Sequence, residues 1–221
     1  METAADRVFL LAIDVTSAPA ELATALRVER DDLIQLLDQA RIEFGELEMA
    51  VICTEERIEL YGAGVNWRRG FRLLLRHFSA RTAGFAGLGS LRVLEANGVP
   101  AGRHLVRITA GLETALDHTE ALRVVNDAAQ VAKLAGTLSL ELEVLFNCAT
   151  AAAVRRVSET DGADAELAVP EIERIVEEEL IAWQAWCARD SRPAGGTPRT
   201  SGFPVEPFTF IRDIKARRTV A

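Results

Sequence analysis

The fold is decided by residues 48–61, whose sequence is EMAVICTEERIELY. An apolar run enters this stretch, a polar cluster interrupts it, and a run of alternating polar and apolar residues leaves it. Apolar and alternating runs of this length are typical of strands, and the polar cluster between them is typical of a turn. The stretch therefore predicts two short strands, at residues 49–53 and 57–62, that meet at a polar junction.

Strand and helix patterns alternate on both sides of this junction. They predict a strand at 7–13, helical residues at 20–44 with a break near 28–30, an amphipathic helix at 67–78 and a strand at 91–95. Together with the two strands of the junction, the order is βαββαβ, which is that of a ferredoxin-like α+β sandwich. We therefore expect an α+β fold in the first half of the chain.

The second half of the sequence is predominantly helical. Apolar residues recur at helical spacing from His104 to about residue 160, with a break at Gly136-Thr137. We interpret these helices as a helical subdomain that closes the sandwich. The first domain is then expected to span residues 1–160.

A shorter helical region is predicted at residues 170–221. Residues 161–169 are small and polar and predict a linker, after which Pro170 begins an amphipathic helix at 171–187. The proline and glycine content of residues 192–207 predicts a loop. Because the apolar stripe of helix 171–187 is too large to leave exposed, we expect a homodimer through this helix.

Composition limits the class of protein. The chain has 221 residues, of which 49% are hydrophobic, and a net charge of −8, so it can bury a core but does not present a basic face all round. No apolar run approaches the roughly 20 residues of a membrane span, and the start of the chain lacks a signal-peptide pattern. The three cysteines are far apart in sequence and show no metal-ligand spacing. We expect a cytoplasmic protein with reduced thiols, no membrane association and no bound metal.

The polar junction resembles the active-site segment of the glutamyl-tRNA reductases, which reads Ser-Thr-Cys-Asn-Arg-x-Glu-(aliphatic)-Tyr. Thr54, Arg57, Glu59 and Tyr61 match this motif. Glu55 stands at the position of the family's nucleophilic cysteine. The resemblance therefore implies the family's substrate, glutamyl-tRNA, together with altered chemistry.

Two further stretches are similar to the same family. Residues 102–114 resemble its His-Leu-Phe-Arg-Val-Ala-x-Gly-Leu-Asp-Ser segment, which aligns His104 with the family's active-site histidine, and residues 12–19 resemble its Gly-x-Asn-His-Lys-Thr-Ala-Pro segment. The similarity covers about residues 7–160, and helix 171–187 is similar to the start of the family's dimerisation helix. The resemblance thus implies the family's N-terminal catalytic domain and part of its dimerisation region.

No cofactor is expected. A dinucleotide-binding unit needs a Gly-x-Gly-x-x-Gly turn between a strand and a helix, and residues 62–67 have Trp67 in place of the third glycine. The interval between Thr160 and Pro170 is too short for a nucleotide domain of on the order of 100–150 residues. We therefore expect neither NADPH binding nor hydride transfer by this chain.

Three residues are candidates for catalysis. Glu55 is a weak nucleophile, and we interpret it either as a general base or as an exposed turn residue. Cys53 lies two positions earlier, about 7 Å away along an extended strand and on the same face, and is either a displaced nucleophile or a small core residue. His104 is predicted to open a helix, whose dipole would lower the histidine pKa and favour neutral imidazole; the alternative is a surface or capping histidine.

Three other residues are candidates for substrate binding. Arg57 suits bidentate pairing with the glutamyl carboxylate or a tRNA phosphate, and the alternative is an ion pair with Glu56 or Glu59. Thr54 either donates a hydrogen bond to the substrate or caps the turn. The resemblance places Arg107 in the same substrate-binding group.

Arg68, Arg69 and Arg72 form a basic cluster within the predicted helix 67–78. Arginine pairs bidentately with phosphate, so the cluster is a candidate tRNA contact, and the alternative is a solvated helix face with ion pairs.

The resemblance thus implies a glutamyl-tRNA reductase-like protein of tetrapyrrole or related biosynthesis that has lost reductase activity. It is expected to bind glutamyl-tRNA, or a partner reductase or biosynthetic enzyme. The alternative is a glutamyl-tRNA-dependent acyl transferase or hydrolase that uses Glu55, His104 and Cys53.

Overall fold

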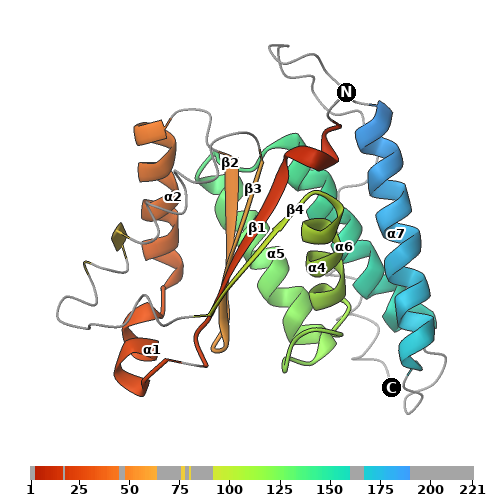
Figure 1. The fold of residues 1–221 in the computed structure, drawn as a ribbon, viewed down its shortest axis with the longest axis horizontal. Coiled ribbons are helices and arrows are strands. Elements are labelled where there is room, and N and C mark those ends of the chain that lie inside the picture. Colours follow the sequence, from red (N-terminus) through yellow and green to blue (C-terminus); the bar gives the residue numbers. More distant parts are fainter. Residues whose placement is uncertain are drawn as a thin grey trace, which may run out of the picture. The chain divides into compact units, whose positions relative to one another are not determined.

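The computed structural model describes residues 3–16, 18–44, 48–63, 76–77, 80, 92–159 and 167–189. Four strands in these ranges form one antiparallel sheet in the order β2-β3-β1-β4 (Figure 1). They are β1 (Val8–Asp14), β2 (Glu48–Cys53), β3 (Arg57–Ala63) and β4 (Arg92–Asn97). This is the strand order of a ferredoxin-like split βαβ sheet, so the predicted α+β class is confirmed. Of the predicted helix 67–78, all but residues 76–77 lie outside the described residues.

Helices cover both faces of the sheet. Figure 1 shows α1 and α2 on one side, α4, α5 and α6 on the other, and α7 as the outermost helix beside α4 and α6. The described helices are α1 (Ala20–Leu26), α2 (Arg30–Phe44), α4 (Val99–Thr109), α5 (His118–Leu134), α6 (Leu140–Glu159) and α7 (Val169–Arg189), and a short 3₁₀ turn, Ala5–Arg7, precedes β1. The breaks predicted near residues 28–30 and at Gly136-Thr137 both separate helices.

Strand β1 is buried on both faces, which explains its uninterrupted apolar sequence. Successive side chains of a strand point to opposite faces, and β3 shows the two destinations. Tyr61 meets Phe146 of α6 edge-on, with ring centroids 5.9 Å apart. Ile58 lines a cavity with Leu26 of α1 on the opposite face. Odd-numbered residues of β3 therefore face α4 and α6, and even-numbered residues face α1 and α2.

Helix α7 is packed onto α4 and α6 of the same chain. A Cβ atom at Gly102 of α4 would lie 2.5 Å from the ring of Trp183, so glycine is needed for the close approach of the two helices. Burying one apolar side chain of α7 contributes about 1.5–3 kcal/mol, whereas a surface ion pair contributes about 0–1 kcal/mol. Apolar packing therefore holds α7 in place. The buried side chains of α7 are Ile172, Ile175, Val176, Leu180, Trp183 and Cys187.

This packing removes the reason for expecting a homodimer through helix 171–187. The stripe that we predicted to need a partner chain is already covered within the chain. Dimerisation itself stays a prediction, and it would have to use another surface.

Two other sequence expectations change. Helix α4 begins at Val99, after Gly98 with a φ of +64°, so His104 lies in the middle of the helix and does not open it. The predicted strand 91–95 is found at Arg92–Asn97.

Of the linker 161–169, only residues 167–169 are described, and the predicted loop 192–207 lies outside the described residues. Within the described ranges, no helix combines the length and apolar character needed to cross a membrane.

Candidate ligand-binding site

His104 lies between two carboxylates. Its Nε2 is 3.2 Å from Glu59 Oε1 of β3, and its Nδ1 is 2.6 Å from Glu113 Oε2 in the connection between α4 and α5. The imidazole is buried because α4 packs on the face of the sheet to which Glu59 points. Two acceptors on opposite sides of one ring suit an imidazolium, which donates from both nitrogens.

The charge of His104 follows from this arrangement. Burial acts to lower the histidine pKa, but hydrogen bonding and charge attraction from Glu59 and Glu113 outweigh burial and raise the pKa above its usual value. The sequence predicted the opposite direction from a helix N-terminal dipole. That prediction is wrong, because His104 sits five residues after the start of α4 and faces carboxylates.

Both carboxylates are held in place by further partners. Tyr61 Oη donates to Glu59 Oε2 at 2.9 Å, which satisfies the second oxygen of a carboxylate that is only 2% exposed. Arg107 Nε donates to Glu113 Oε1 at 2.5 Å, and the same guanidinium pairs with Glu173 of α7. Hydrogen bonds and ion pairs therefore run without a break from Tyr61 in the sheet to Glu173 in α7.

This cluster borders a cavity of about 520 Å³. Asp14 of β1 lies opposite both Arg57 of β3 and Arg92 of β4 in the sheet, so the three side chains form a charged row at one end of the sheet. Neither Arg57 nor Arg92 makes an ion pair with any residue that the structure describes. The described residues lining the cavity are Ala12, Asp14, Arg57, Arg92, Val93, Leu94, His104 and Glu113.

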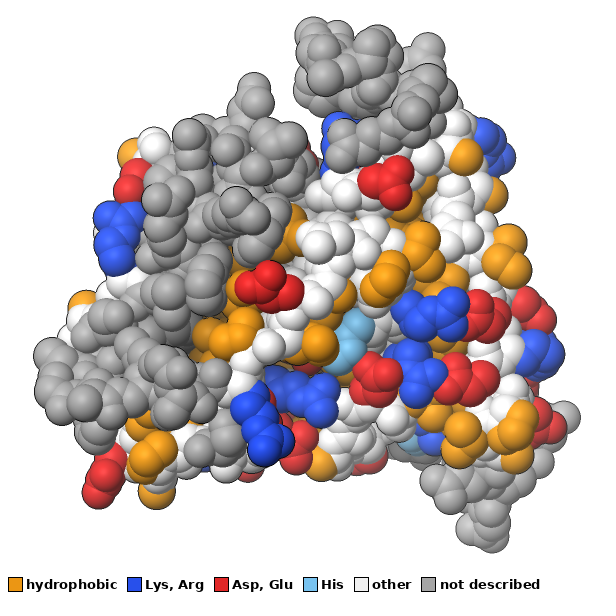
Figure 2. Space-filling model, viewed as in Figure 1, with side chains coloured by type: hydrophobic (Ala, Val, Ile, Leu, Met, Phe, Trp, Pro, Cys, Tyr) orange, Lys and Arg blue, Asp and Glu red, His pale blue; other side chains and the backbone are white. Residues whose placement is uncertain are grey.

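The surface view agrees with this charge pattern. Figure 2 shows acidic and basic side chains gathered side by side on the face of the molecule that it views. Val93 and Leu94 of the edge strand β4 are exposed beside the cavity, at 45% and 50%. The cavity thus offers guanidinium groups, carboxylates and an apolar edge within one opening.

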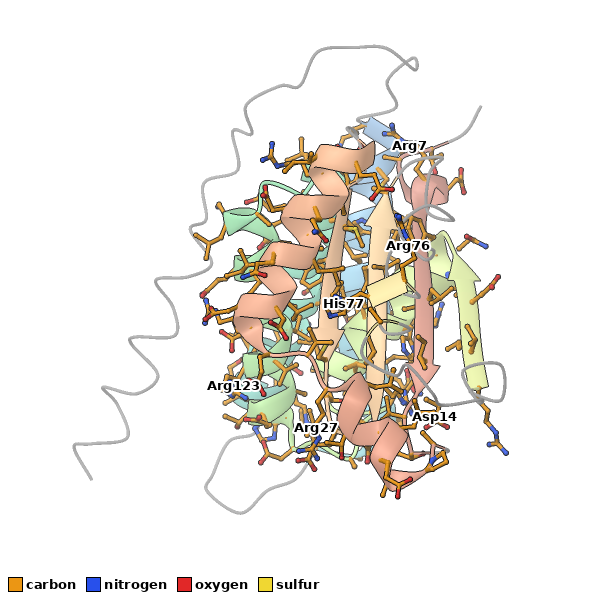
Figure 3. The ribbon with its side chains drawn as sticks, turned by 90° about the vertical axis from the view of Figure 1, so that its left-hand side faces the viewer. Arg7, Asp14, Arg27, Arg76, His77 and Arg123 are labelled. Atoms are coloured by element: carbon orange, nitrogen blue, oxygen red, sulfur yellow. The ribbon has the colours of Figure 1, made fainter. Side chains whose placement is uncertain are left out.

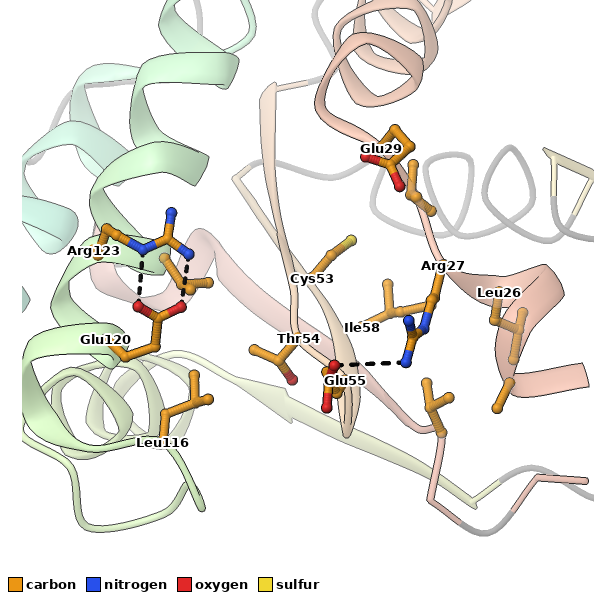
Figure 4. Close-up of a pocket in the computed structure, with 14 residues that line it drawn as sticks. Leu26, Arg27, Glu29, Cys53, Thr54, Glu55, Ile58, Leu116, Glu120 and Arg123 are labelled. Carbon is orange, nitrogen blue, oxygen red and sulfur yellow. Dashed lines mark hydrogen bonds and ion pairs between the residues drawn. The ribbon is translucent and has the colours of Figure 1, made fainter. Parts of the chain in front are cut away.

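The turn between β2 and β3 is organised by Thr54. Its Oγ1 accepts hydrogen bonds from the backbone N–H groups of Glu56 and Arg57, at 3.3 and 3.0 Å. Thr54 therefore caps the turn, which is the second of the two roles predicted for it from the sequence. The side chain of Glu55 is 83% exposed and lies 3.6 Å from Arg27, which Figure 4 marks with a dashed line.

Cys53 faces away from the histidine cluster. It pairs with Ile58 in the sheet and lines a second cavity, of about 260 Å³, together with Arg27 and Glu55 (Figure 4). Burial, with a smaller contribution from the charge of Glu59, raises the pKa of the Cys53 thiol to about 12. At neutral pH the sulfur is therefore a thiol, and a thiol is a poor nucleophile.

Charged residues also ring this second cavity. Figure 3 labels Arg27 and Arg123 at the same end of the sheet as Asp14. Arg123 of α5 is paired within its own helix, with Glu120 at 2.6 Å and with Asp127 at 3.1 Å. Unlike Arg57, this guanidinium is already neutralised.

The predicted site residues therefore fall into three groups. His104 and Arg57 line one cavity, which Arg107 joins through Glu113. Cys53, Thr54 and Glu55 line the other. The predicted tRNA contacts Arg68, Arg69 and Arg72 lie outside the described residues.

Sequence reasoning missed Glu113, Arg92 and Glu173. Glu113 stands where the resembling family has aspartate beside Gly-Leu, so its position in the motif was an available signal. Arg92 and Glu173 come from an edge strand and a distant helix, and only the fold brings them here. The described residues contain no group of three His, Cys, Asp or Glu side chains arranged to hold a metal ion.

The known proteins that this chain resembles are glutamyl-tRNA reductases. Residues 11–160 match the family described as glutamyl-tRNAGlu reductase, N-terminal domain. The glutamyl-tRNA reductase of Geobacillus kaustophilus is 30% identical over 158 residues, and that of Halorhodospira halophila is 29% identical over 167 residues. These alignments cover 70% and 69% of this chain, which spans 34% of each relative's length. The solved glutamyl-tRNA reductase of Methanopyrus kandleri matches with a TM-score of 0.54 and 21% identity, over 80% of this chain and 47% of its own.

Proposed function

Since the chain belongs to the family of glutamyl-tRNA reductase N-terminal domains, we propose that its 520 Å³ cavity binds the glutamyl group of glutamyl-tRNA without forming a thioester. One observation carries this proposal. Arg57 and Arg92 have no ion-pair partner among the described residues, although they stand beside a cluster of carboxylates. A guanidinium left unpaired in a cavity is suited to an anionic ligand.

The cavity matches the charges of a glutamyl ester. The side-chain carboxylate of the ligand pairs with Arg57, whose planar fork accommodates two carboxylate oxygens. The α-ammonium group is attracted by Asp14 and Glu113, which line the same cavity. The exposed Leu94 offers an apolar wall to the remainder of the ligand. The two signs of charge and the apolar wall together favour an amino acid ester over a simple anion.

The chemistry of the neighbouring residues favours binding over acyl transfer. Glu55 replaces the motif cysteine and would give a hydrolysable anhydride if it attacked the ester. His104 has a raised pKa, and each of its ring nitrogens already faces a carboxylate. When the ring is protonated, both N–H groups donate to these carboxylates and no lone pair is left to accept a proton. Cys53 is a thiol that lines the other cavity. The proposed role of His104 is to supply charge and hydrogen bonds.

The acyl transferase or hydrolase alternative gains no support from these positions. This alternative requires Glu55, Cys53 and His104 to surround one acyl group. Glu55 and Cys53 line the 260 Å³ cavity, whereas His104 lines the 520 Å³ cavity. We therefore propose binding of glutamyl-tRNA, and not acyl transfer, as the function.

Partners follow from the same proposal. Arg68, Arg69 and Arg72 remain candidate contacts to the tRNA backbone. Another chain, either a second copy or a biosynthetic enzyme that receives the charged tRNA, would have to bind a surface other than the buried stripe of α7. Val169 and Ile181 are apolar residues of α7 outside that stripe, and they are 59% and 62% exposed.

The test follows the fate of a labelled glutamyl group. The protein is mixed with glutamyl-tRNA carrying radiolabelled glutamate, and binding, protein-linked label and free glutamate are measured together with an uncharged-tRNA control. We expect glutamyl-tRNA to bind at least about tenfold more tightly than uncharged tRNA, which corresponds to about 1.4 kcal/mol. We also expect no protein-linked label and deacylation at the background rate. Equal binding of both tRNAs would contradict the binding proposal, and label on the protein would contradict the absence of acyl transfer.

A further inference from the structure

Two ion pairs join α4 to α7 one helical turn apart. Arg103 pairs with Glu177, and Arg107 pairs with Glu173. The two helices run antiparallel at these positions, because moving four residues forward on α4 moves four residues back on α7. The pairs are therefore closely matched in type and location.

Only one of the two pairs continues into the ligand cavity. Arg107 also donates through Nε to Glu113, and Glu113 lies 2.6 Å from His104. The pair of Arg107 and Glu173 is more buried, at 24% and 32% exposure, than the pair of Arg103 and Glu177, at 44% each. Less exposure means less screening by water and salt, so Glu173 acts more strongly on its surroundings.

We propose that Glu173 is a positioning residue of the ligand cavity. It fixes the guanidinium of Arg107 so that Nε–H points at Glu113, and Glu113 in turn holds the ring of His104 toward Glu59. Glu173 lies beyond residues 11–160, the range that matches the family, so α7 contributes to the cavity from outside that range. The consequence for ligand affinity rests on the proposed function, whereas the effect on His104 does not.

The charges around His104 give the direction of the effect. With Glu173 in place, the charge of Arg107 is balanced by two carboxylates. Without it, the excess positive charge of Arg107 draws on Glu113 and opposes the positive charge of the imidazolium. The groups in contact with His104 are Glu59 from β3 and Glu113 from the α4–α5 connection. Tyr61 from β3 bonds to Glu59, Arg107 from α4 bonds to Glu113, and Glu173 from α7 pairs with Arg107. The charged groups that line the same cavity are Asp14 from β1, Arg57 from β3 and Arg92 from β4.

The experiment compares Glu173→Gln with Glu177→Gln, each removing one carboxylate from α7. NMR follows the imidazole signals of the three histidines with pH, and a His104→Gln variant assigns the signal of His104. We expect Glu173→Gln to lower the midpoint of the His104 titration by about 0.5 pH unit or more, and Glu177→Gln to lower it by less than half as much. Glu173→Asp, which restores the charge, is expected to recover most of the shift.

A second readout measures the ligand. The affinity for 3′-glutamylamino-3′-deoxyadenosine, a stable amide in place of the ester, is expected to fall about threefold to tenfold in Glu173→Gln and to stay within about twofold in Glu177→Gln. Thermal unfolding of both variants shows that each is folded before it is titrated.

The outcomes separate this inference from the proposed function. Equal midpoints in Glu173→Gln and Glu177→Gln, or no change in either, overturn the positioning role even if the amide binds. A wild-type protein that does not bind the amide overturns the proposed function, and the His104 titration still decides the role of Glu173.

Discussion

His104 Nδ1 lies 2.6 Å from Glu113 Oε2, and this contact joins the centre of the cavity to the helices that surround it. Replacing Glu113 with Gln removes a negative charge and a charge-assisted hydrogen bond, so we expect the pKa of His104 to fall. NMR titration of the imidazole measures the change. Glu120→Gln, an exposed change on α5, serves as the control. An unchanged midpoint in Glu113→Gln would show that Glu113 does not set the charge of His104.

The raised pKa of His104 predicts how stability depends on pH. A histidine whose folded pKa lies above its unfolded value of about 6.5 stabilises the fold fully below that value, and this contribution is lost as pH rises through the folded pKa. The free energy of unfolding is therefore expected to fall above about pH 6.5. Urea unfolding across this range measures the slope, and His104→Gln is expected to flatten it. A steeper slope in the variant would contradict the assignment.

The packing of α7 on α4 predicts the effect of one methyl group. Gly102→Ala forces the Trp183 ring or the whole of α7 to move, because the added Cβ would lie 2.5 Å from the ring. We expect a loss of about 1–3 kcal/mol in unfolding free energy. Adding Trp183→Phe, which makes room, is expected to cost less in the Gly102→Ala background than in the wild type. Strict additivity of the two changes would mean that the two side chains do not compete for space.

The raised thiol pKa values predict low cysteine reactivity. Burial is the main cause that raises the pKa of both Cys53 and Cys148 to about 12, and Cys187 is buried. A disulfide reagent at pH 8 is expected to modify the native protein slowly and the unfolded protein at all three positions. Cys53→Ser is expected to leave glutamyl-tRNA binding unchanged. Fast labelling of Cys53 in the folded protein would revive it as a candidate nucleophile.

The sheet and the helix breaks were predictable because they depend on local patterns. The alternation in residues 57–62 and the apolar run of residues 49–53 give β3 and β2 within one residue at each end. The start of α4 was missed because Val99 and Pro100 follow a strand that the pattern ended too early. His104 was therefore placed at a helix terminus, and the direction of its pKa followed from that error.

The cavity was only partly predictable, because its residues come from separate elements. His104 and Arg57 were identified from their motifs. Which residues surround each side chain depends on the face of the sheet to which it points. Cys53 pairs with Ile58 and therefore lies on the face opposite to that of Arg57. Helix α7 was interpreted as an intermolecular element, since an apolar stripe has the same sequence whether it covers its own chain or another.

The proposed recognition of the glutamyl group by Arg57 is tested most directly by the equilibrium affinity for glutamyl-tRNA and uncharged tRNA in matched arginine variants. Arg123→Ala, a change to a guanidinium already paired on α5, is the control. We predict that Arg57→Ala loses the preference for the charged tRNA by about tenfold or more, that Arg57→Lys loses part of it, and that Arg123→Ala keeps it. An unchanged preference in Arg57→Ala would contradict the account.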